Sequence, residues 1–141
     1  MKTKTVTPLV KYIIGWIPLP IVAIFNGILR DFTYSQIAGE QLARQISSVL
    51  LSLLVMLYVA LLSSHVQLNS LRQSVLAGLI WLLLTVTFEL ILGLVVGTSF
   101  RDQLASYNIF EGNFWPIVLL SVFVSPIVFR KRDHENQVHT T

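Results

Sequence analysis

The amino-acid sequence predicts an all-α, polytopic membrane protein with four transmembrane helices and a short amphipathic helix between the third and the fourth. Only 12% of the 141 residues are charged and 54% are hydrophobic, whereas soluble domains average about 25% charged residues. The apolar residues are gathered in four runs, and a helix needs about 20 mostly apolar residues to cross the hydrocarbon core. Lysine and arginine residues flank these runs, as they do in membrane proteins.

We expect one transmembrane domain over residues 1–141, ending in a basic cytoplasmic tail at 131–141, with helices at residues 9–30, 40–62, 72–97 and 114–130. The first run has no small-x-small cleavage site after it, which favours a retained anchor over a signal peptide. Pro18 and Pro20 lie inside this run. Because proline lacks an N–H, the carbonyls of Ile14 and Trp16 lose their helical donors, and a kink is predicted.

The segment before the fourth run has the pattern of a short amphipathic helix. Ser99 is placed to cap it, and Phe100, Leu104 and Tyr107 follow at i, i+4 and i+7. This spacing puts three apolar side chains on one helical face. We expect the helix to lie in the membrane interface, and packing against the end of the bundle is the alternative.

The distribution of Lys and Arg predicts the orientation. With four crossings, the three basic residues on one side are Arg30, Arg44 and Arg101. The seven basic residues on the other side are Lys2, Lys4, Lys11, Arg72, Arg130, Lys131 and Arg132. Cytoplasmic loops carry the excess of positive charge, so both termini are predicted to be cytoplasmic.

Small and polar residues form a stripe along the third run. Trp81, Thr85, Glu89, Gly93 and Gly97 follow at steps of four residues and end in a GxxxG motif. In lipid, such stripes mark the faces at which helices meet. Gly93 and Gly97 are therefore predicted to be helix-packing positions, either within the chain or across a homodimer.

Glu89 is the polar residue of greatest interest, because it lies about 15 Å from the end of its helix at 1.5 Å per residue. A bare carboxylate at that depth is costly, so it must be paired or protonated. We predict a buried polar site made by residues from three helices, namely Glu89, Arg30, Arg44, Asn26, Thr85 and Ser48. Three roles stay open: a buried ion pair or hydrogen-bond hub that fixes how the helices pack, a carboxylate that handles protons or cations in a polar cavity, and catalysis.

The outer face carries a second set of candidates. Arg101 and Tyr107, together with Arg30 and Arg44, would suit a phosphate or carboxylate group. The alternative roles are a solvated Arg101–Asp102 pair and an interfacial aromatic position for Tyr107. The chain has no cysteine and three histidines without ligand spacing, so neither a metal site nor a cofactor is predicted.

Several short patterns resemble those of an uncharacterised family of small four-helix bacterial inner-membrane proteins. The matching residues are Thr87, Phe88, Glu89 and Gly93, then Tyr107, Asn108, Gly112 and Trp115, with Asn26, Gly27 and Arg30 at the end of the first run. The resemblance implies a bacterial inner-membrane location and no particular activity. The small multidrug transporters differ, because their membrane glutamate is in the first helix.

The sequence therefore predicts a small, non-enzymatic membrane protein with a buried polar site around Glu89. The alternatives are a proton- or ion-coupled small transporter or channel subunit, and an enzyme acting on a lipid-linked substrate. No nucleophile–base pair or metal set points to catalysis. The expected partners are the lipid bilayer and either a second copy or a larger membrane complex. Nucleic acid is not an expected partner, because the basic residues flank the apolar runs.

Overall fold

The computed structural model describes residues 3–130, and this part of the chain is all-α, without strands. The elements are α1 (Thr3–Ile14), α2 (Pro18–Phe32), α3 (Ser35–Ala38), α4 (Glu40–His65), α5 (Leu71–Val96), α6 (Phe100–Ala105), the 3-10 helix η1 (Ile109–Glu111) and α7 (Trp115–Val128). The predicted all-α class is confirmed. The tail predicted at 131–141 lies outside the described residues.

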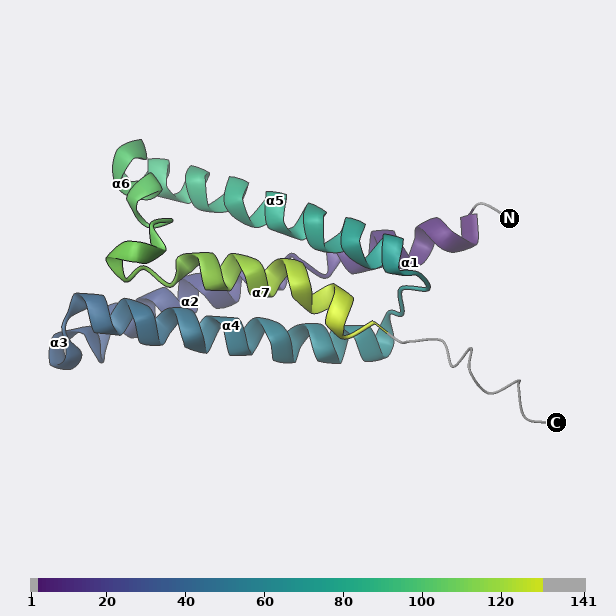
Figure 1. Ribbon diagram of the computed structural model, residues 1–141, viewed down its shortest axis with the longest axis horizontal. Helices are drawn as coiled ribbons and strands as arrows, with labels where there is room; N and C mark the ends of the chain where they lie inside the picture. The colour runs from purple at the N-terminus through teal and green to yellow at the C-terminus, as the bar shows by residue number, and fades with distance from the viewer. Residues whose placement is uncertain (1–2, 131–141) are drawn as a thin grey trace.

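The long helices run side by side in an elongated bundle (Figure 1). Helix α7 lies between α4 and α5 and packs against both. Helices α3 and α6 lie at one end, called here the α6 end, and α1 and the loop between α4 and α5 lie at the other, called the α1 end.

Within residues 3–130, three segments are long and apolar enough to cross a membrane: Pro8–Phe32, Glu40–His65 and Leu71–Val96. Helix α7 is apolar but has only 14 residues, which gives a length of about 21 Å. This is shorter than a hydrocarbon core of about 30 Å. The fourth crossing, expected at 114–130, therefore stays a prediction.

The kink expected at Pro18 and Pro20 is a complete break between α1 and α2. The carbonyl oxygens of Ile14 and Trp16, which lose their i+4 donors, accept i+3 hydrogen bonds instead. Ile17 N donates to Ile14 O at 3.1 Å, and Leu19 N donates to Trp16 O at 2.9 Å. The oxygen of Gly15 accepts the Tyr58 hydroxyl at 2.6 Å. Because α1 packs on α5 whereas α2 packs on α4, the break moves the chain from one neighbour to another.

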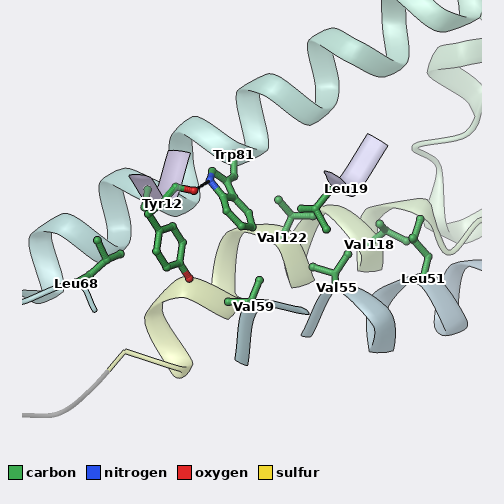
Figure 2. Packing of buried hydrophobic residues seen from close by; sticks show 10 residues of the cluster. Tyr12, Leu19, Leu51, Val55, Val59, Leu68, Trp81, Val118 and Val122 are labelled. Atoms are coloured by element: carbon green, nitrogen blue, oxygen red, sulfur yellow. Dashed lines mark hydrogen bonds between the residues drawn. The ribbon is translucent and has the colours of Figure 1, made fainter. Parts of the chain in front are cut away.

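The α1 end is tightly packed around Trp81 (Figure 2). The side chain of Trp81 is fully buried, and its Nε1 donates to Tyr12 O at 3.2 Å. The ring centroids of Trp81 and Tyr12 are 5.2 Å apart. A Cβ on Gly78 would lie 2.3 Å from the backbone oxygen of Phe123. Helices α5 and α7 therefore approach each other here as closely as their backbones allow.

Candidate functional site

A cavity of about 600 Å³ occupies the part of the bundle toward the α6 end, between α2, α4, α5 and α7. The structure brings all six residues of the predicted polar site to its wall. They are Asn26, Arg30, Arg44, Ser48, Thr85 and Glu89.

The cavity follows from the break between α1 and α2. Helix α2 packs on α4 and makes no comparable contact with α5 or α7 in the described part of the chain, so space remains between them. Trp16, in the break, lines the cavity. Its Nε1 donates to Thr85 Oγ1 at 3.0 Å, and its ring meets Phe88 edge to face. Trp16 therefore links the break to α5.

Glu89 is held by two aromatic side chains rather than by an arginine. Its Oε2 accepts a hydrogen bond from the Tyr107 hydroxyl at 2.7 Å and another from Trp115 Nε1 at 2.7 Å. Hydrogen bonds to a charged acceptor are shorter and stronger than neutral ones. No described residue donates to Oε1, so the second oxygen of this half-buried side chain is without a protein partner.

Tyr107 reaches Glu89 because α6 is shorter than the periodicity predicted. Ser99 caps α6 as predicted, accepting from Asp102 N, but the helix ends at Ala105. Tyr107 therefore leaves the face on which Phe100 and Leu104 remain exposed. Burial, followed by the bond to Glu89, raises the pKa of the Tyr107 hydroxyl well above its ordinary range. The hydroxyl therefore stays protonated and donates at neutral pH.

The two arginines do not approach Glu89, contrary to expectation. Arg30 Nε pairs with Asp31 Oδ1 at 2.8 Å, and Arg44 Nη2 pairs with Glu40 Oε2 at 3.1 Å. For Arg30 the reason is its axial position. Taking the contact between Trp16 and Thr85 as a common level, Glu89 lies about 6 Å further toward the α6 end and Arg30 about 20 Å further, at 1.5 Å per residue.

Two buried amides of the cavity wall have unpartnered oxygens. Asn26 is 6% exposed, and its Nδ2 donates to Ser47 O and Oγ at 3.0 and 2.8 Å. Gln103 is also 6% exposed, and its Nε2 donates to Thr98 O at 3.2 Å. Asn26 Oδ1 and Gln103 Oε1 have no hydrogen-bond partner in the described part of the chain. An unsatisfied buried polar group costs about 1–3 kcal/mol.

The GxxxG motif divides into two roles. A Cβ on Gly93 would lie 2.4 Å from Gln103 Cδ, so Gly93 makes room for the α6 amide. Gly97 has φ 86° and ends α5, and nothing lies within 4 Å of a Cβ built there. Within the described part of the chain, Gly97 acts as a helix cap, because the left-handed conformation at this place favours glycine, and packing at Gly97 across a homodimer stays a prediction. Sequence reasoning missed Gln103, for which the facing Gly93 was the available signal.

The anion site predicted from Arg101, Tyr107, Arg30 and Arg44 is not assembled in the structure. Arg101 is exposed and is not part of the cavity wall, which Arg30 and Arg44 do line. The Tyr107 hydroxyl is engaged by Glu89. The described residues also bring together no group of three or more His, Asp or Glu side chains that could hold a metal ion.

Comparisons with protein-family models, curated proteins and solved structures found no match. Membership of the bacterial family suggested by short patterns therefore stays a prediction. Three residues of that resemblance, Glu89, Tyr107 and Trp115, are the ones joined by hydrogen bonds at the site.

Proposed function

We propose that this chain is a small, non-enzymatic multi-pass membrane protein whose cavity binds a small amphiphilic molecule beside Glu89. The observation that carries the proposal is a cavity of about 600 Å³ that contains this carboxylate, which pairs with no cationic side chain of the described residues. Ligand sites are typically about 300–1,000 Å³, mostly apolar, with a few convergent polar groups. An intramembrane carboxylate is by default a candidate functional group.

The proposed topology has four crossings with both termini in the cytoplasm of a bacterial cell. Three apolar segments of sufficient length support it. The burial of α7 between α4 and α5 also supports it, because a central helix can be shorter than its neighbours. The excess of Lys and Arg expected on the α1 end sets the direction.

Single-cysteine labelling tests the topology, since the natural chain contains no cysteine. Gln36→Cys and Glu111→Cys should react with an impermeant maleimide in intact cells. Gln67→Cys and Arg130→Cys should react only after permeabilisation. Labelling of Arg130→Cys in intact cells would show that α7 does not cross.

Protection from labelling tests ligand binding. Ser48→Cys lies in the cavity wall and should react with a small methanethiosulfonate reagent. Ser125→Cys is the matched control, because Ser125 is 2% exposed and outside the cavity wall. A bound amphiphile, with 1-decanol and decylammonium as probes, should slow the reaction of Ser48→Cys. If neither probe slows it, the cavity is not a ligand site.

A proton- or ion-coupled transporter is the second candidate, favoured by the break between α1 and α2 beside the cavity. Discontinuous helices next to a deep polar site are a recurring feature of transporters. Proteoliposomes should then show flux that Glu89→Gln abolishes and Glu111→Gln retains. Absence of flux in a folded, oriented preparation would reject transport and leave ligand binding in place.

A further inference from the structure

Resting on the proposed function, we propose that the ligand is an organic cation whose head carries N–H donors, a protonated primary amine or a guanidinium, attached to an apolar tail. Three acceptor oxygens without a protein partner belong to residues of the same cavity wall. They are Glu89 Oε1, Asn26 Oδ1 and Gln103 Oε1. Each can accept an N–H that the protein itself does not supply.

The distribution of charged residues favours a cation beside Glu89. Among residues 3–130 the ion pairs are Arg30–Asp31 and Arg44–Glu40, near the α6 end. Both arginines therefore have an acidic neighbour, and Glu89 has no basic one. A cationic head beside Glu89 would supply the partner that an ionised carboxylate inside the bundle requires, whereas an anionic head would meet a carboxylate at a site of reduced dielectric.

The hydrogen-bonding groups favour N–H donors in particular. The donors of Tyr107 and Trp115 are directed to Glu89, and the amide nitrogens of Asn26 and Gln103 donate to Ser47 and Thr98. The polar atoms of these residues that remain without a partner are therefore hydrogen-bond acceptors. A carboxylate or phosphate ligand would add further acceptors, and a quaternary ammonium would leave the amide oxygens unsatisfied.

Two of the acceptors, those of Glu89 and Gln103, lie close enough together for one head group. Gln103 lies against Gly93, which is one helical turn, about 6 Å, from Glu89. An ammonium or guanidinium between the two can bond to both. Trp16, Phe88 and Trp115 also line the cavity, and aromatic rings attract cations within about 6 Å of their faces.

The tail has a place as well. Exposed apolar residues edge the cavity on α2 and on α5, namely Ile24, Ile28, Leu92 and Val96. These two helices do not pack along each other. An alkyl chain can therefore extend between them while its head stays beside Glu89.

Three probes of equal chain length test the inference on the purified full-length protein at pH 7, by tryptophan fluorescence. They are decylammonium, decyltrimethylammonium and 1-decanol. Decylammonium should bind roughly ten- to hundred-fold more tightly than 1-decanol, the effect of one charge-assisted hydrogen bond. Decyltrimethylammonium should bind less tightly than decylammonium. Glu89→Gln should abolish the preference for decylammonium over 1-decanol. Glu111 is exposed, and Glu111→Gln should keep this preference.

The outcomes separate the two proposals. Equal binding of decylammonium and 1-decanol overturns the cationic ligand and leaves the amphiphile site in place. Equal binding of the two ammonium probes overturns the need for N–H donors. Binding of none of the three rejects the proposed function itself. The wild-type series decides these points even if Glu89→Gln fails to fold.

Discussion

The two ends of the bundle share the long helices α4, α5 and α7 but differ in how fully their interior is filled. At the α1 end, Tyr12 and Trp81 are buried and the polar groups of both find partners. Toward the α6 end, Glu89 lines a cavity and keeps one oxygen without a protein partner. The difference begins at Gly15–Ile17, where the first helix leaves α5 for α4. One break in one helix is thus enough to create a site in a bundle that otherwise packs closely.

Gly78→Ala should have the largest effect on stability, because it acts on the α1 end, whose interior is filled. The new Cβ would lie 2.3 Å from the backbone oxygen of Phe123, and α5 and α7 must separate to accept it. We expect a loss of about 3 kcal/mol, at the upper end of the range for overpacking. Thermal unfolding in detergent measures it.

Gly27→Ala is the matched control for this change. Its Cβ would meet only Arg30 Nη2, at 3.9 Å, and alanine is the better helix former. We expect the thermal unfolding midpoint of Gly27→Ala to equal or exceed that of the wild type. If Gly78→Ala were as stable as Gly27→Ala, the close approach of α5 and α7 would be wrong.

Tyr107→Phe should have the next largest effect and acts on the open end. It removes one of the two hydrogen bonds to Glu89 Oε2, with an expected loss of about 1.5 kcal/mol. The raised pKa of Tyr107 sets the pH window. A hydroxyl whose pKa is higher in the folded state stabilises fully below the unfolded pKa of about 10 and loses this contribution as the pH rises beyond it.

The measurement is the stability difference between wild type and Tyr107→Phe from pH 7 to 11. It should be constant up to about pH 10 and shrink above that value. A difference that stayed constant up to pH 11 would argue against a Tyr107 hydroxyl held protonated by burial and Glu89.

The sequence predicted the long helices, because apolar runs are a local property. It did not predict the partners of Glu89. Its i+7 spacing placed Tyr107 on the apolar helical face of Phe100 and Leu104, but α6 ends two residues before Tyr107. Where a short helix ends depends on tertiary contacts, here including Asn113 Nδ2, which donates to Ala105 O and Asn108 O. Periodicity carries no information about such contacts.

Gly93→Ala should have a smaller effect than Gly78→Ala, although both added methyl groups meet atoms closer than 3 Å. At Gly93 these atoms are the end of the flexible Gln103 side chain, which can turn away. Alanine also gains about 1 kcal/mol of helix propensity. We expect a net change within about 1 kcal/mol and faster hydrogen exchange in α6. A loss as large as that of Gly78→Ala would mean that the open end is as rigidly packed as the filled one.

Arg30→Gln and Arg44→Gln should have the smallest effects. If either arginine neutralised Glu89, its removal would leave a deep carboxylate unpaired and cost several kcal/mol. Both arginines instead pair with acidic residues whose side chains are 62% and 84% exposed, and exposed pairs contribute about 0–1 kcal/mol. We therefore expect midpoints close to that of the wild type. A large loss in either variant would place an arginine beside Glu89, fill the open end with a buried ion pair, and remove the reason for a cationic ligand.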